Sequence, residues 1–282
     1  MKVALALLLA LPLVVAAEPF VPKDDAAIVQ RLPYRVGAAE RARRAALARD
    51  PAQLPLAAAA ARAALDRARV LGDPRELGVA QAALAPWWTT ADAPAEAALL
   101  RARVLQARHD FDGAQVDLKR LLARNDLPPE LHAQALLDAA AVHQLRAELP
   151  EARALCEQLR PMAAVPATAC LAELASLSGE ARQAEQTLAQ LAPPRGFTPW
   201  LVLMRAELAE RLGDARALPL YRQALAGADE VYTRAALADW LLAQDRATEA
   251  LTLTEQAEAD ALLLRHVIAL RRLGRDASEP TA

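Results

Sequence analysis

Glycine and aromatic residues are scarce in this sequence of 282 residues, and these shortages already exclude some folds. There are nine glycines, and phenylalanine, tryptophan and tyrosine together make up 4% of the chain. β-branched residues are also few, which argues against a protein built from strands. Hydrophobic residues nevertheless reach 55%, because alanine and leucine are abundant. Both lose little conformational entropy in a helix, so the composition predicts an all-α protein.

The common signatures of catalysis and metal binding are missing as well. The sequence contains no G-x-S-x-G, no phosphate-binding loop and no dinucleotide-binding glycine pattern. Its four histidines are not spaced as a ligand set, and we expect structural or surface roles for them. They are His109, His132, His143 and His266. We therefore predict a protein that is not an enzyme and that holds no cofactor and no metal.

One long apolar run occurs, and it lies at the N-terminus. Lys2 precedes an apolar stretch over residues 3–17, which ends in the small residues Val15-Ala16-Ala17 before Glu18. A membrane-spanning helix needs about 20 apolar residues, so this stretch is too short to span. The pattern is that of a cleaved signal peptide over residues 1–17, without a cysteine for lipid attachment. We expect a periplasmic mature protein with no integral membrane span.

Charge of neither sign dominates the expected mature chain. Loss of residues 1–17 removes one lysine and leaves 32 basic and 35 acidic residues, a formal charge of −3. A nucleic-acid-binding protein typically carries a basic patch and a high isoelectric point. Nucleic acid is therefore not an expected partner.

Alanine recurs along the chain at a nearly regular interval. Five alanines are 38, 32, 33 and 33 residues apart, and most of them follow a turn-like pair such as Gly179-Glu180. They are Ala114, Ala152, Ala184, Ala217 and Ala250. A period near 34 residues is typical of stacked helical hairpins, in which each repeat buries its apolar face on the next.

Each repeated alanine begins a short pattern in its helix: a small residue, a larger residue four positions later, and a small or apolar residue three beyond. The sets are Ala114/Leu118/Leu121, Ala152/Cys156/Leu159, Ala184/Leu188/Leu191, Ala217/Tyr221/Ala224 and Ala250/Thr254/Ala257. In this pattern the hairpins resemble tetratricopeptide repeats. The resemblance implies an α-solenoid, a right-handed superhelix of about six hairpins with a C-terminal capping helix. The first hairpin departs from it, since Leu77 or Gly78 stands where the small alanine is expected.

Prolines and capping residues give the expected helix boundaries. Asp50-Pro51, Asp73-Pro74 and Thr198-Pro199 each place a capping side chain before a proline at the first helical position. The predicted hairpins pair 51–71 with 74–85, 95–108 with 111–124, 129–145 with 150–159, 167–177 with 181–191, 199–212 with 215–226, and 231–243 with 247–258. A last helix is predicted over 259–273. Residues 18–50 form a lead-in with short helices at 24–32 and 38–49, residues 51–276 the repeat domain, and 277–282 a flexible tail.

The resemblance also implies a concave groove lined by the first helices of the hairpins. Family members that grip a peptide carboxylate use lysine, asparagine and arginine there, but this chain has residues such as Leu99 and Leu137, so such a clamp is not expected. The predicted partner-binding residues are Leu99, Arg103, Gln106, Leu137, Gln144, Glu173, Glu210 and Asp239, flanked by Ala206 and Leu242. This mixture suggests a protein or peptide partner held by hydrogen bonds and leucine-sized contacts. We predict a protein-binding scaffold of the periplasm. The alternative is a structural or adaptor subunit of a cell-envelope assembly or export complex, and an enzyme whose site the sequence hides is the weakest hypothesis.

Two further features stay open at the level of sequence. Cys156 and Cys170 fall, by the repeat register, on adjacent helices of the third and fourth hairpins. They form either a disulfide, which a periplasmic location would permit, or two buried thiols. Trp87-Trp88 follows the first hairpin and either fills its junction with the second or contacts a partner.

Overall fold

In the computed structural model the described residues are Asp24, 37–192 and 195–275. They form fourteen α-helices and two short 3₁₀ turns, and no strand occurs among them. The chain divides into two units, Met1–Arg41 and Ala42–Ala282, and the second holds every hairpin. The predicted signal peptide and tail lie outside the described residues, as does the predicted helix at 24–32 apart from Asp24.

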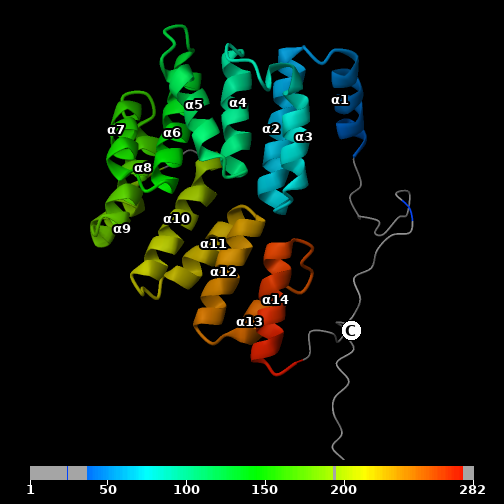
Figure 1. Ribbon diagram of the computed structural model, residues 1–282. Helices are drawn as coiled ribbons and strands as arrows, with labels where there is room; N and C mark the ends of the chain where they lie inside the picture. The colour runs from blue at the N-terminus through cyan, green and yellow to red at the C-terminus, as the bar shows by residue number, and fades with distance from the viewer. Residues whose placement is uncertain (1–23, 25–36, 193–194, 276–282) are drawn as a thin grey trace, which may run out of the picture. The chain divides into compact units, whose positions relative to one another are not determined.

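Helices α2 to α13 form six hairpins; in Figure 1, α2 to α7 lie across the upper part of the view and α10 to α13 below them. The hairpins are α2 (Leu54–Leu71) with α3 (Arg75–Ala83), α4 (Ala95–Ala107) with α5 (Phe111–Leu122), α6 (Pro129–Leu145) with α7 (Leu149–Leu159), α8 (Ala164–Leu177) with α9 (Ala181–Gln190), α10 (Thr198–Arg211) with α11 (Ala217–Gly227), and α12 (Val231–Ala243) with α13 (Ala247–Leu253). Helix α1 (Ala38–Arg49) precedes them and α14 (Asp260–Arg272) follows. The fold is an all-α solenoid of the predicted kind.

None of the three helix starts predicted at a capping residue before a proline is exact. Helix α3 begins at Arg75 and not at Pro74, and Pro74 is its N-cap. Helix α2 begins at Leu54 and not at Pro51, with Gln53 as its N-cap. Pro55 can occupy the second helical position because an amide there has no partner within the helix. Helix α10 begins at Thr198, which is therefore a helical residue and not the cap.

The end of the sixth hairpin and the start of the fourth also differ from prediction. Helix α8 begins at Ala164, three residues before the predicted start, because Pro166 is tolerated in a first turn. Helix α13 ends at Leu253, five residues before the predicted end, and Thr254 follows it outside helical geometry. The bounds of α1, α6 and α12 agree with the prediction to the residue.

Each hairpin turns on one residue with left-handed backbone geometry. The φ values are 63° at Gly72, 63° at His109, 62° at Ala147, 99° at Gly179, 65° at Gly213 and 56° at Asp245. After five of these residues the next amide donates to a carbonyl five positions earlier, as from Asp110 N to Leu105 O at 2.9 Å. This is the Schellman arrangement, which satisfies carbonyls left over at a helix end. Since the same device recurs, the hairpins share one internal geometry.

The repeated alanines lie where helices approach closely. All five are at most 2% exposed: Ala114, Ala152, Ala184, Ala217 and Ala250. A small side chain there lets the neighbouring backbone come near, which is what the packing of adjacent hairpins needs. The role that the sequence pattern predicts for them is confirmed.

One contact between helices joins two hairpins that are not neighbours in the sequence. Helix α12 packs against α2, although four hairpins separate them in the sequence. Val231 lies beside Gly72, and Arg69 forms an ion pair with Glu230. A solenoid repeat ordinarily touches only the repeats next to it, so this contact joins two distant parts of the row.

No helix in the described ranges combines the length and apolar character that a bilayer-spanning segment requires.

Candidate functional site

Polar contacts join the first helices of successive hairpins. Arg103 of α4 donates to Asp138 of α6, with Nε 2.6 Å from Oδ2. Arg211 of α10 donates to Ser176 of α8, with Nη2 2.9 Å from Oγ. The two residues of each pair are 35 positions apart, as expected for equivalent places in neighbouring repeats. These contacts therefore mark the row of first helices on which the groove was predicted.

Arg103 is held firmly within this row. Its side chain is 31% exposed and that of Asp138 is 13% exposed. Gln134 adds a bond from Nε2 to Asp138 Oδ1 at 3.0 Å. The guanidinium of Arg103, a predicted groove residue, is thus bonded to Asp138 of its own chain. This bond links α4 to α6.

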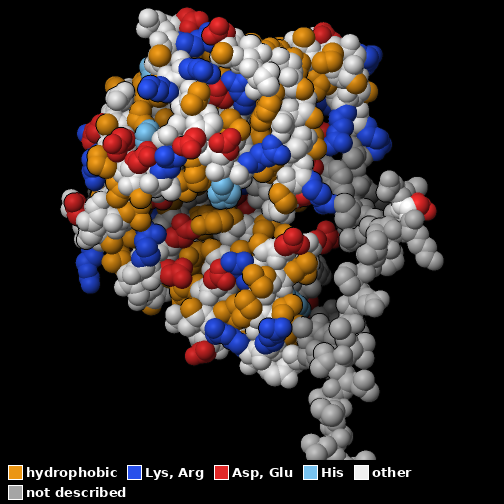
Figure 2. Space-filling model, in the orientation of Figure 1, with side chains coloured by type: hydrophobic (Ala, Val, Ile, Leu, Met, Phe, Trp, Pro, Cys, Tyr) orange, Lys and Arg blue, Asp and Glu red, His pale blue; other side chains and the backbone are white. Residues whose placement is uncertain are grey.

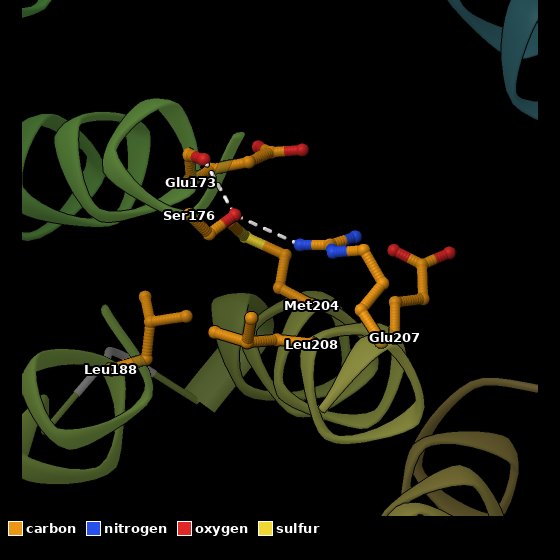
Figure 3. A pocket seen from close by; sticks show the side chains of 7 residues that line it. Glu173, Ser176, Leu188, Met204, Glu207 and Leu208 are labelled. Atoms are coloured by element: carbon orange, nitrogen blue, oxygen red, sulfur yellow. Dashed lines mark hydrogen bonds between the residues drawn. The ribbon is translucent and has the colours of Figure 1, made fainter. Parts of the chain in front are cut away.

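A small pocket lies between α8 and α10 (Figure 3). Leu188, Met204 and Leu208 contribute its apolar lining. Ser176 Oγ donates to the Glu173 carbonyl at 2.7 Å and accepts the bond from Arg211. The free volume is only about 10 Å³, roughly that of one water molecule. Because it is so small, the pocket has no room for an organic substrate.

The carboxylates of two glutamates lie at the rim of this pocket. Figure 3 shows Glu173 on α8 and Glu207 on α10 reaching toward the same open side. Burial raises the pKa of the Glu207 carboxyl, and the nearby Glu173 charge raises it further. Tyr232 of α12 donates its hydroxyl to Glu207 Oε1 at 2.7 Å, which lowers the pKa of that carboxyl in part. Burial and the bond to Glu207 in turn raise the pKa of the Tyr232 phenol.

One exposed aromatic side chain contacts the Glu207 carboxylate, and a second lies farther along α10. Tyr232 is 59% exposed although its hydroxyl bonds Glu207. Trp200 is 39% exposed and lies seven residues before Glu207 on α10, two turns away on the same side of the helix. We call Glu173, Trp200, Glu207 and Tyr232 the acidic-aromatic surface. Such side chains can anchor a partner by apolar burial and by hydrogen bonds.

Charge over the visible face of the molecule is mixed. Figure 2 shows acidic and basic side chains interspersed, with no broad area of one sign. On this face, long-range attraction of one sign of charge is therefore weak.

Three of the predicted groove residues do not line an open surface. Leu99, Ala206 and Leu242 are 4%, 0% and 5% exposed, and they belong to the hydrophobic cores between helices. Arg103, Gln106, Leu137, Gln144 and Glu173 are half-buried, while Glu210 and Asp239 are exposed.

Both exposed predicted residues contact their own chain. Glu210 accepts a hydrogen bond from Tyr221 of α11, and Asp239 forms an ion pair with Arg265 of α14. Of the eight predicted partner-binding residues, only Glu173 belongs to the acidic-aromatic surface.

The predicted set does not include Asp138, Trp200, Glu207 or Tyr232. Its register was carried from one repeated alanine to the next, and those steps vary between 32 and 38 residues. On α10 the predicted register is one position too early, so it assigns Ala206 to the groove instead of Glu207. The spacing of 34 residues between Glu173 and Glu207 was the available signal.

The two cysteines are joined in the structure. A disulfide connects Cys156 of α7 to Cys170 of α8, with Cα atoms 6.1 Å apart. The residues are 0% and 6% exposed and lie within a hydrophobic cluster. The bond therefore links the third hairpin to the fourth through the core.

The tryptophan pair lies at the junction of the first two hairpins. Trp87 packs against the cores of both hairpins, and Trp88 packs against the first. Both are half-buried. Arg101 donates to the carbonyl oxygens of Trp87, Trp88 and Thr90, which holds this segment on the second hairpin. Packing at the junction accounts for much of their surface.

The described part of the chain contains no group of three or more histidine, cysteine, aspartate or glutamate residues that could hold a metal ion.

Comparison with known proteins finds solved structures that resemble this chain. No protein-family model matches the sequence, and no curated protein matches it. A thermophilic TPR protein of Thermus thermophilus is 26% identical, with a TM-score of 0.54 over 63% of this chain and 100% of that one. A tetratricopeptide repeat protein of Parabacteroides merdae is 17% identical, with a TM-score of 0.59 over 82% of this chain and 91% of that one.

Proposed function

We propose that this chain, a tetratricopeptide repeat protein, is a protein-interaction scaffold whose partner binds across the acidic-aromatic surface. The repeat fold itself suggests a role in protein interaction, because stacked hairpins present an extended surface. The observation that carries the proposal is the exposure of two aromatic side chains: Tyr232, which bonds the Glu207 carboxylate, and Trp200, two turns away on the same side of α10. Tryptophan and tyrosine dominate the binding energy of many protein interfaces.

The partner is a protein or peptide segment that offers apolar side chains and hydrogen-bond donors. Trp200 and Tyr232 supply apolar area at a low entropy cost, since their side chains have few rotatable bonds. The Glu173 and Glu207 carboxylates accept hydrogen bonds, and Tyr232 is already oriented by its bond to Glu207. No step of bond making or breaking belongs to this function.

The proposal is tested by replacing the two aromatic residues. Trp200→Ala combined with Tyr232→Ala is expected to weaken partner capture at least tenfold, since each anchor contributes about 1–2 kcal/mol. Capture is measured by crosslinking the mature protein in the native cell envelope and quantifying the crosslinked partner. Leu145→Ala is the control, because Leu145 is 58% exposed but lies at the α6–α7 turn. Equal capture by the double variant and the control would contradict the proposal.

We also propose that the protein acts in the periplasm. Support comes from the N-terminal pattern of Lys2, the apolar stretch and the small residues before Glu18. The mature protein is expected to begin at Glu18. Mass spectrometry of the N-terminal peptide after osmotic release from bacterial cells measures this, and a chain that retains Met1 in the cytosol would exclude the location.

A further inference from the structure

The outward face of the last helix, α14, is apolar. Leu263, Leu264 and Ile268 are 43%, 60% and 36% exposed, and Leu273, just beyond the helix, is 38% exposed. The end of a solenoid ordinarily carries a polar outer face, because no further repeat covers it. Exposed apolar side chains gathered on one helix mark an interaction surface.

The opposite side of α14 is buried against the rest of the chain. Leu262, Ala269 and Leu270 are at most 4% exposed, and the helix packs on α12 and α13. The helix therefore has two apolar sides, and only one of them is used within the chain.

Charged residues flank the outward face at its two ends. At 3.6 residues per turn, Asp260, Leu264, Ile268 and Arg271 fall within about 80° of one side of the helix. Asp260 lies at the N-terminal end and Arg271 at the C-terminal end, and both are exposed. In Figure 2 hydrophobic side chains gather over the position of α14, with acidic side chains above them and basic side chains below.

The other arginines of α14 are engaged by the chain itself. Arg265 forms an ion pair with Asp239, and Arg272 donates to the carbonyl oxygen of Leu242. Within the described residues, the structure records no hydrogen bond or ion pair of the Arg271 side chain. The charge of Arg271 is therefore available to a partner of the outward face.

We propose that this face binds the same face of a second copy of the chain, with the two α14 helices antiparallel about a two-fold axis between Leu264 and Ile268. In that arrangement Leu264 packs against the partner's Ile268, and Asp260 lies near the partner's Arg271. The same contacts are made twice, as a two-fold interface requires. A parallel pairing would instead bring Arg271 next to the partner's Arg271, and the like charges would repel.

A second copy fits this face better than a lipid surface does. Asp260 would be repelled by anionic headgroups, and the acidic and basic ends of the helix have no counterpart in a membrane. Charge at helix ends also complements the helix dipole of a single chain, so charge alone does not identify the partner. The apolar centre between the two charged ends makes the face complementary to itself.

The expected dimer is weak. One pair of helices buries less surface than the 1,200–2,000 Å² or so of a standard protein interface. A dissociation constant of roughly 1–100 μM is therefore expected, as for other small and transient interfaces, and the mature protein should be monomeric at low concentration.

Analytical ultracentrifugation of the mature protein tests the association, over concentrations from about 1 μM to about 500 μM. A monomer–dimer equilibrium is expected for the wild type, and a monomer throughout would overturn the proposal. Leu264→Glu is expected to weaken dimerisation more than tenfold, because it places a charge in the apolar centre. Leu145→Glu, which changes an equally exposed leucine elsewhere, should leave dimerisation unaltered. Equal effects of the two substitutions would also overturn it.

Charge reversal tests the antiparallel arrangement specifically. Asp260→Arg and Arg271→Asp should each weaken self-association, because each leaves like charges facing one another. A mixture of the two variants should associate again, since every charged contact between the unlike copies then joins opposite charges. Asp260 also acts electrostatically on Arg75 of α3, an effect within one chain that mixing cannot repair. If the mixture stays monomeric while the wild type dimerises, the proposed arrangement is wrong.

Discussion

Arg101 is the most deeply buried basic residue among those described, and its environment explains why it is retained. It is 5% exposed, and its Nε and Nη2 atoms are each 2.6 Å from an oxygen of Asp117, which is 4% exposed. Its Nη1 atom donates to the carbonyls of Trp88 and Thr90 at 3.0 Å. A buried charge is tolerated only where such partners replace water. The pair therefore holds Arg101 in the position from which it bonds the segment between the first two hairpins.

Asp117→Ala is predicted to lower the free energy of unfolding by about 3–5 kcal/mol, because it leaves the Arg101 charge buried without its carboxylate. Urea unfolding followed by circular dichroism measures the change. The matched control is Glu157→Ala, which removes a carboxylate from the exposed pair with Arg160 and should change little. Similar results for the two variants would mean that Arg101 is compensated in another way.

The pKa of Glu207 makes stability depend on pH. Burial raises this pKa in the folded chain above its unfolded value, so folding disfavours the ionised form. The stability linked to Glu207 is full below the unfolded pKa and is lost as pH rises through the folded pKa. Glu207→Gln keeps an acceptor for Tyr232 and removes the titration. The variant should be more stable than the wild type at pH 7 and about as stable at pH 4.

Unfolding experiments at several pH values measure this difference. Glu249→Gln should behave in the opposite sense, because the bond to Arg246 lowers the pKa of that carboxyl. Loss of the Glu249 carboxylate should destabilise the protein at neutral pH. The effect should become smaller at low pH, where the wild-type carboxyl is protonated. A stability difference for Glu207→Gln that does not vary with pH would show that Glu207 is not the titrating group.

At the scale of the element, the hairpin turn is the repeated unit. Each turn needs one residue with positive φ, yet only Gly72, Gly179 and Gly213 are glycines. Aspartate and histidine enter this region more readily than most residues with a side chain, and they occupy two of the remaining turns. Alanine has no such advantage, so the strain of the left-handed geometry at Ala147 has no side-chain bond to offset it.

Ala147→Gly is therefore predicted to raise the free energy of unfolding by about 0.5–1 kcal/mol, the left-handed penalty less the entropy cost of glycine. Thermal unfolding measures it. Ala141→Gly, in the interior of the α6 helix that precedes this turn, should do the reverse and cost about 1 kcal/mol. A loss of stability at both positions would show that the Ala147 turn is unstrained.

At the scale of the whole repeat unit, the contact between α2 and α12 distinguishes this protein from a simple row of hairpins. It brings Val231 against Gly72 and pairs Arg69 with Glu230. The contact rests on a few side chains of α2, its following turn and α12. It should therefore be sensitive to single substitutions.

Gly72→Ala and Gly213→Ala form a matched test of that contact. The φ angles are 63° and 65°, so the backbone cost should be alike, about 1–2 kcal/mol. A Cβ at Gly72 would lie 2.8 Å from Val231 Cγ1, whereas one at Gly213 would meet nothing within 4 Å. Gly72→Ala should therefore destabilise the protein more than Gly213→Ala in urea unfolding. Equal costs would indicate that α12 does not press on the α2–α3 turn.

Much of the helical plan could be predicted because local physics sets it. Pro129 can only begin a helix, and Gly179 and Gly213 favour the left-handed turn between two helices. The repeated alanines, such as Ala114, mark close helix contacts wherever the hairpins stack. The site was harder, because a surface residue leaves little trace in the pattern. One position of register separates Ala206, which is buried, from Glu207 on the acidic-aromatic surface.

The sequence by itself determined the helices, their pairing and the small residues on which they pack, since these follow from backbone preferences and a short period. Only the tertiary structure decided that α2 meets α12, that Arg103 is bound to Asp138, and that one face of α14 stays uncovered. Each of these depends on small rotations between successive hairpins, which add up along the row. Those rotations arise from side-chain packing at every interface, and no local stretch of residues encodes their sum.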